Sequence, residues 1–159
     1  VLRLLRAGEV LDELELPRLE EVDIAAGAAV TASNPHVGAG AHPESVVGQD
    51  GNWQFAWNDE PRPGWIELAW RSPQTFNHVG MTFAQAEYSS RDCEVFVSDD
   101  GKTWRSVWRG SSDEVAGGTF ASTTSRYLRV AFHQGGRWAN LVSLTRLRVG
   151  YLPARRPGG

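Results

Sequence analysis

One short stretch constrains the fold more than any other part of the chain: Val95-Phe96-Val97-Ser98-Asp99-Asp100-Gly101-Lys102-Thr103-Trp104. Residues from Cys93 onward follow the period of a strand, so every second side chain from Cys93 to Val97 is expected on one face. Gly101 provides the backbone freedom that a tight reversal requires. A second strand is predicted over residues 104–108, and the stretch therefore predicts a β-hairpin.

The chain after residue 23 continues this pattern of short alternating segments and turns. Further strands are predicted at 29–33, 65–70, 79–83, 119–121, 126–132 and 145–151. No segment in this part has the period of a long amphipathic helix. Evenly spaced short strands between turns that contain Gly and Pro are typical of a β-sandwich or a β-barrel.

The two ends of the chain differ from its centre. Leucines recur at helical spacing over residues 1–16, although Gly8 interrupts the pattern and Pro17 ends it. We predict that residues 1–22 are a helical linker or the tail of a preceding domain, while a partner-binding helix is the alternative. Residues 23–151 are expected to form the β-domain. Residues 152–159 are polar, contain Pro and Gly, and are expected to be a disordered tail.

Composition excludes several functions. The net charge of the chain is −3, and no basic field is present that would hold phosphate backbones, so we expect no nucleic-acid partner. No run is long and apolar enough to span a membrane. Cys93 is the single cysteine, which allows no internal disulfide, and it is interpreted as a small buried side chain.

Several segments occur in an order that is typical of one protein family. Besides the VSDDGKTW hairpin they are AAVTASN (28–34), PESVVGQDGNWQFAW (43–57), GWIELAW (64–70), FNHVGMTF (76–83), SRYLRVAF (125–132) and LTRLRVGY (144–151). In this order they resemble the discoidin family, also called the coagulation factor V/VIII C-type (F5/8 type C) domain. Many bacterial members are carbohydrate-binding modules of the family 32 type. The resemblance covers roughly residues 23–151 and implies an all-β, eight-stranded jelly-roll sandwich with ligands held by loops at one end.

The family resemblance also implies a place for a structural calcium ion, and the sequence departs from the family there. Many carbohydrate-binding members hold the ion with loop carbonyls, an Asp in a Val-Asp-Gly turn and a Glu in the closing strand. The matching positions here are the Val47-Gly48 turn and Arg146. Calcium requires several oxygen ligands and negative charge, so a guanidinium disfavours it. We therefore expect no cofactor and no metal site, and we expect Arg146 to pair with an acid of residues 50–60.

Sugar binding requires a flat aromatic side chain against the C–H face of a pyranose, surrounded by planar donors and acceptors. The richest stretch follows Gly135-Gly136, where a planar cation, an aromatic ring and an amide occur within a few residues. Loop stretches of this composition provide the candidate ligand-binding residues. These are His36, His42, Trp53, Gln54, Phe55, Tyr88, Arg137, Trp138 and Asn140.

Some of these residues also have a structural interpretation. Of Trp53 and Phe55, one is expected to pack inward and the other to form the aromatic platform. A histidine in such a loop is commonly a plain surface residue, and the alternative for Trp138 is that it closes the bottom of the barrel. Trp57 matches the core Trp of the family and is interpreted as structural. The tryptophans of the predicted strands are assigned to the core or the sheet surface: Trp65, Trp70, Trp104 and Trp108.

The sequence contains no hydrolase elbow, metalloprotease helix or phosphate-binding glycine loop, and we expect no catalysis. The resemblance implies a lectin-like, non-catalytic carbohydrate-binding module that targets an attached catalytic domain to a glycan. Such a module belongs to a secreted bacterial protein that is extracellular or at the cell surface. Two alternatives stay open: a structural accessory domain of a multidomain enzyme, and a protein- or lipid-binding adhesion module.

Overall fold

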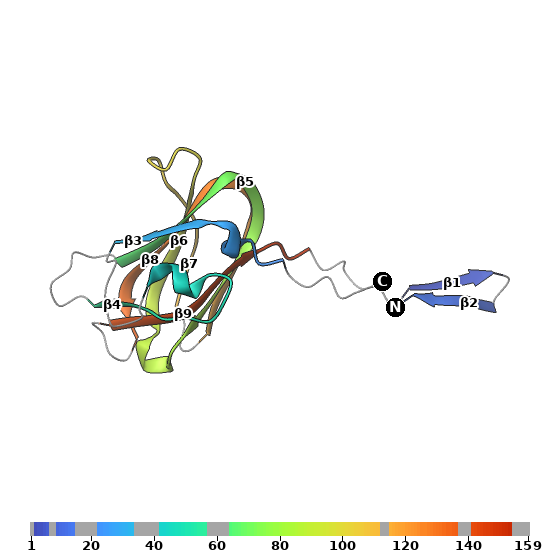
Figure 1. Cartoon of the computed structure of the whole chain (residues 1–159), viewed down its shortest axis with the longest axis horizontal. Helices are drawn as coiled ribbons and strands as arrows, with labels where there is room; N and C mark the ends of the chain where they lie inside the picture. Colours follow the sequence, from blue (N-terminus) through green and yellow to red (C-terminus); the bar gives the residue numbers. More distant parts are fainter. Residues whose placement is uncertain are drawn as a thin grey trace.

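The computed structural model describes residues 2–6, 9–14, 22–33, 42–56, 64–111, 115–136 and 141–153. For residues 2–6, 9–14, 55–56 and 115–116 it describes the backbone alone. A two-stranded sheet and a seven-stranded sheet contain most of these residues (Figure 1). The elements are β1 (Leu2–Arg6), β2 (Glu9–Leu14), the short 3-10 helix η1 (Ile24–Gly27), β3 (Ala29–Ala32), η2 (Pro43–Val46), β4 (Trp53–Ala56), β5 (Gly64–Phe83), η3 (Ala86–Tyr88), β6 (Ser90–Ser98), β7 (Arg105–Gly110), β8 (Val115–Gly135) and β9 (Leu141–Gly150).

The seven strands β3 to β9 form two layers because β5 and β8 bend and run through both. One layer, here called the front layer, contains β3, the start of β5, the end of β8, β6 and β7 in this order. The back layer contains the start of β8, the end of β5, β9 and β4. The register between β5 and β8 is interrupted between Ala69 and Gln74, where both strands bend. The predicted all-β sandwich is confirmed.

Two pairs of predicted strands are continuous in the structure. The strands expected at 65–70 and 79–83 are both parts of β5, and those expected at 119–121 and 126–132 are both parts of β8. The exposed residues 71–73 between the first pair break the apolar alternation, although the strand continues through them. The alternation of apolar side chains therefore shows where a strand leaves the core. It does not show where the strand ends, because β5 and β8 each continue around the bend.

Alternating side chains from both layers meet in the core, as the sequence pattern predicts. In β6 the side chains of Cys93, Val95 and Val97 are buried, with at most 3% of their surface exposed. The predicted inward faces of β5 and β8 are buried too, at Ile66, Leu68, Trp70, Val79, Met81, Phe83, Leu128, Val130 and Phe132. In β9, Leu147 and Val149 are buried, but Tyr151 is 49% exposed because the strand ends at Gly150.

The N-terminal segment is not helical, which corrects the sequence prediction. β1 and β2 form an antiparallel hairpin of their own, with Leu2 opposite Leu14 and Arg3 opposite Glu13. Arg6 likewise lies opposite Glu9. Cross-strand pairs of opposite charge favour antiparallel pairing, and Gly8 disfavours a continuous helix. The leucine spacing was therefore compatible with both structures.

The hairpin between β6 and β7 has the turn that the sequence predicts. Gly101 has a φ of +71°, a left-handed conformation that favours glycine. The Asp100 carboxylate accepts hydrogen bonds from the backbone N–H groups of Thr103 (2.7 Å) and Lys102 (2.8 Å) and from the Ser98 hydroxyl (3.0 Å). Hydrogen bonds from Thr103, and then from Lys102 and Ser98, lower the pKa of Asp100 to about 2.

At the C-terminal end the chain remains bonded to the sandwich through Leu152. The Asn77 amide donates to the Leu152 carbonyl and accepts from the Leu152 N–H, both at 2.7 Å. Residues 154–159, most of the predicted tail, lie outside the described residues. No helix among the described residues is long and apolar enough to cross a membrane.

Candidate functional site

The strand register brings the ends of most strands together at one end of the sandwich, here called the loop end. In the front layer, Ala32 at the end of β3 lies opposite Ile66, and Gly135 at the end of β8 lies opposite Ser90 at the start of β6. In the back layer, β4 ends and β9 begins where Ala56 lies opposite Leu141. The segments that join these strands start and finish at this end. They are 33–42, 57–63, 84–89 and 136–140.

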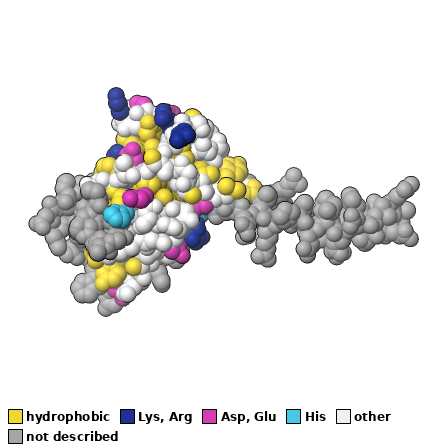
Figure 2. Space-filling model, viewed as in Figure 1, with side chains coloured by type: hydrophobic (Ala, Val, Ile, Leu, Met, Phe, Trp, Pro, Cys, Tyr) yellow, Lys and Arg dark blue, Asp and Glu magenta, His cyan; other side chains and the backbone are white. Residues whose placement is uncertain are grey.

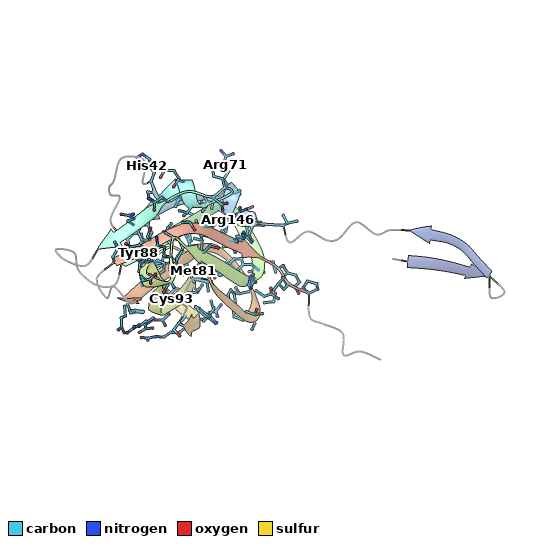
Figure 3. The ribbon with its side chains drawn as sticks, turned by 90° about the horizontal axis from the view of Figure 1, so that it is seen from below. His42, Arg71, Met81, Tyr88, Cys93 and Arg146 are labelled. Carbon is cyan, nitrogen blue, oxygen red and sulfur yellow. The ribbon has the colours of Figure 1, made fainter. Side chains whose placement is uncertain are left out.

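These four segments include six of the nine predicted ligand-binding residues, and the other three, Trp53, Gln54 and Phe55, lie in β4 just before the second segment. His42 precedes η2, Gln54 lies in β4, and Tyr88 ends η3. Gln54 and His42 are exposed, and Tyr88 is half-buried. Figure 3 shows His42 and Tyr88 well separated, so these two side chains do not converge on one small ligand. Phe55 lies in β4 opposite Val142, with its backbone alone described.

The structure corrects the prediction that Trp53 is a ligand-binding residue. Its side chain is fully buried, and its ring packs against Phe132, with 5.9 Å between centroids. A fully buried indole presents no face to a ligand, so Trp53 is a core residue and not part of a ligand surface. The side chain closes the core directly beneath the loop end, next to exposed Gln54.

The loop that contains η3 is fixed by short hydrogen bonds. The Ser89 hydroxyl donates to the Ala86 carbonyl at 2.7 Å, and the Ser90 hydroxyl donates to the Gln134 carbonyl at 2.7 Å. Gly136 packs so closely here that a Cβ atom would lie 2.7 Å from Ser89 Oγ and 3.0 Å from the Ala86 carbonyl oxygen. The close approach requires glycine at 136. It holds η3 against Gly136 at the end of β8.

The segment that carries His42 is also fixed. The His42 carbonyl accepts from the Ser45 hydroxyl at 2.7 Å, and the same hydroxyl accepts from the Asn52 N–H at 3.1 Å. The Asn52 side chain in turn accepts from the Ser143 hydroxyl of β9 at 3.1 Å. This chain of bonds ties η2 to the start of β4. Four of the predicted residues, His36, Arg137, Trp138 and Asn140, and also Trp57, lie outside the described residues.

At the position where the family resemblance implies a calcium ion, the protein has the guanidinium of Arg146. Val47 pairs with Leu147 in an isolated bridge, so the Val47-Gly48 turn lies beside the closing strand β9. Arg146 of that strand donates from Nη1 to Asp50 Oδ1 at 3.2 Å. This is the pairing with the 50–60 segment that the sequence predicts. The described residues contain no cluster of three metal-ligating side chains. A guanidinium beside a single exposed carboxylate does not fit the oxygen-rich shell that calcium requires.

Sequence reasoning missed one arrangement on the outer face of the front layer. Arg129 of β8 stacks on the rings of Trp65 and Trp104, with its guanidinium carbon 4.4 and 4.2 Å from the two ring centroids. Alternation places Trp65 and Arg129 on the outer faces of their strands, which the sequence does indicate. That the two strands pair with Glu67 opposite Arg129 depends on register, which the sequence does not reveal.

Comparison with known proteins identifies the family to which this fold belongs. Residues 29–144, well over half of the chain, match the model of the F5/8 type C domain. The chain belongs to this family. No curated protein sequence gives a significant match.

Solved structures with this F5/8 type C fold include several carbohydrate-binding modules. Chitosan-binding module 1 from a chitosanase/glucanase of Paenibacillus sp. IK-5 is 25% identical, with 80% of this chain and 97% of that chain covered and a TM-score of 0.68. CpGH89CBM32-5 from Clostridium perfringens, in complex with GalNAc-beta-1,3-galactose, is 20% identical, with 82% and 99% covered and a TM-score of 0.66. The family 32 module of NanJ from C. perfringens, in complex with galactose, is 15% identical, with 82% and 98% covered and a TM-score of 0.67.

Proposed function

We propose that the chain is a carbohydrate-binding module that holds a glycan at the loop end. The observation that carries this proposal is the family match, together with structural neighbours of nearly the same length that are named as carbohydrate-binding modules. The fixed loops and the buried Trp53 support a rigid end on which exposed polar side chains are held in place. A site that is ordered before the ligand arrives costs less conformational entropy on binding.

In this proposal the 137–140 segment provides the principal contacts. Trp138 packs on the C–H face of the sugar, and Arg137 and Asn140 bond its hydroxyls. Gln54 and Tyr88 extend the surface across β4 and η3, Phe55 at the end of β4 is a further candidate contact, and His36 and His42 lie at its rim. Trp53 is no longer part of the set, because it is buried. One shallow site of this kind is expected to bind with a dissociation constant of ~0.1–1 mM.

Charge on the described surface is consistent with a neutral ligand rather than an anionic polymer or lipid. Figure 2 shows Lys and Arg side chains at separate positions among acidic and apolar ones on the face that it presents. The net charge of the whole chain is −3. Because the described residues on this face form no concentrated basic patch, they provide only weak electrostatic attraction for a phosphate-bearing partner.

The module is proposed to act without catalysis, attached to a catalytic domain in a secreted bacterial protein. Binding to the glycan would raise the local concentration of the substrate around that domain. The Paenibacillus neighbour, a binding module derived from a chitosanase/glucanase, supports this arrangement. Purification of the parent protein and assay of its activity with and without residues 23–151 would test it. We expect the truncated form to match the parent protein in activity on soluble substrate. We expect it to be less active than the parent protein on insoluble glycan.

The binding proposal is tested by calorimetric titration with galactose, GalNAc-beta-1,3-galactose and chitotriose. We expect saturable heat with at least one of them in the wild type and none in Trp138→Ala. Tyr151→Ala is the matched control, since it removes an aromatic ring that is 49% exposed away from the loop end. Loss of binding in both variants, or in neither, would contradict the assignment of the site.

A further inference from the structure

A hollow on the outer face of the front layer has the composition of a ligand site, and none of its lining residues belongs to the four loop-end segments. It encloses a volume of about 170 Å³. The strand register creates it, by placing Trp65 of β5 opposite Ala131 of β8, and Phe96 of β6 opposite Arg129. Ala131 forms part of the wall and leaves the space open because its side chain is small. The lining residues are Trp65, Phe96, Trp104, Arg129, Ala131 and His133.

The polar groups of the hollow are held in fixed positions. Arg129 donates from Nη2 and Nε to Glu67 Oε2, at 2.7 and 3.1 Å, while its plane stacks on two indole rings. Stacking and the ion pair together immobilise a side chain that is ordinarily flexible. Arg129 Nη1 and the indole N–H groups of Trp65 and Trp104 have no hydrogen-bond partner among the described residues. They are donors available to a ligand.

The charged side chains around the hollow already have partners. Glu67 pairs with Arg129, and Glu94 pairs with His133 Nε2 at 2.8 Å. Arg109 forms two bonds with Asp92, at 2.6 and 2.7 Å, and lies 3.7 Å from Glu94. A charged ligand would meet no unpaired opposite charge here and would lose its hydration. An uncharged ligand with many hydroxyls would meet fixed donors and acceptors at little electrostatic cost.

We propose that this hollow is a second saccharide site, which takes one neutral pyranose ring. Three aromatic side chains provide the apolar surface for the C–H face of the ring, and the fixed donors of Arg129 and the two indoles bond its hydroxyls. The volume is below the ~300–1,000 Å³ of sites for drug-sized ligands, which suits a single ring. The hollow shares the class of ligand with the proposed function but none of its residues. Two sites on one module would bind a branched or surface-anchored glycan with greater avidity than either alone.

The test uses the full chain labelled with ¹⁵N and observed by two-dimensional NMR. The indole N–H signals of Trp65 and Trp104, assigned through Trp65→Phe and Trp104→Phe, report on the hollow. The side-chain amide of Gln54 and the backbone amide of Gly136 report on the loop end. The saccharides are galactose, N-acetylgalactosamine and chitotriose. Ala131→Leu places a larger side chain in the wall of the hollow, where Ala131 is buried, and Ala69→Leu makes the same change at a half-buried position of β5 that does not line the hollow.

We expect a saccharide to shift both indole signals in the wild type and in Ala69→Leu, with loss of the shift in Ala131→Leu. Shifts confined to Gln54 and Gly136 would overturn this inference and leave the proposed function intact. Shifts confined to the two indoles would support it while the loop-end proposal fails. Absence of any indole shift, or indole shifts that persist in Ala131→Leu, would overturn it. Indole shifts that depend on protein concentration without saccharide would overturn it too, since they would indicate pairing with a second copy.

Discussion

Trp53 and Gln54 are neighbours in β4 with opposite environments, and the pair allows a quantitative test of the loop end. Trp53 is fully buried and Gln54 is exposed. A buried aromatic side chain removes ~150–250 Å² from water, which at ~25 cal/mol per Å² corresponds to ~4–6 kcal/mol. Residual compactness of the unfolded chain reduces such values by ~10–40%. Trp53→Ala should therefore lower the free energy of unfolding by about 3–5 kcal/mol, the usual range for such truncations.

Gln54→Ala is the matched control for this prediction. The change removes an exposed side chain, so we expect the free energy of unfolding to stay within ~0.5 kcal/mol of the wild type. Both variants are measured by urea denaturation followed by far-ultraviolet circular dichroism, because removing Trp53 alters fluorescence. A loss below ~1 kcal/mol in Trp53→Ala, or an equal loss in both variants, would refute the inward assignment of Trp53.

Three further predictions follow from single sites. The pKa of Asp100 in the folded protein is about 2, against an ordinary 3.8, so its contribution to stability is full above 3.8 and is lost as pH falls towards 2. The stability advantage of wild type over Asp100→Asn should shrink across that interval in acid denaturation curves, and an advantage independent of pH would contradict this. Burial raises the pKa of Cys93 to about 12, so a disulfide reagent at neutral pH should label it only after unfolding; rapid labelling of the native protein would refute the prediction. Because Arg146 pairs with Asp50, calcium and EDTA should leave the thermal midpoint unchanged, and a rise with calcium would contradict the reasoning.

Much of the sandwich is predictable from the sequence because period-2 alternation reports which face of a strand is buried. The inward faces of β6, β5 and β8 follow directly from it. The turn at Gly101 follows from local chemistry that does not depend on the rest of the fold. The family pattern predicted that Arg146 pairs with an acid of residues 50–60, and in the structure that acid is Asp50.

Other features depend on information that a strand's own sequence does not contain. The leucine spacing of residues 1–16 fits a helix as well as the β1–β2 hairpin, and the cross-strand pairs that distinguish them form only when the strands meet. That the side chain of Trp53 is fully buried depends on the pairing of β4 with β9, which places the strand over the core. The stack of Arg129 on two indoles requires the register of β5 against β8 and the position of the hairpin that carries Trp104.

The central claim is that this F5/8 type C domain binds glycans at the loop end. A glycan-array screen of the full chain, with circular dichroism to verify folding, tests it most directly. The account predicts saturable binding to at least one class of glycan, and loss of that binding in Trp138→Ala but not in Tyr151→Ala. A folded sample that binds no glycan on the array would contradict the claim, and would favour a structural accessory domain whose loops pack against a neighbouring domain.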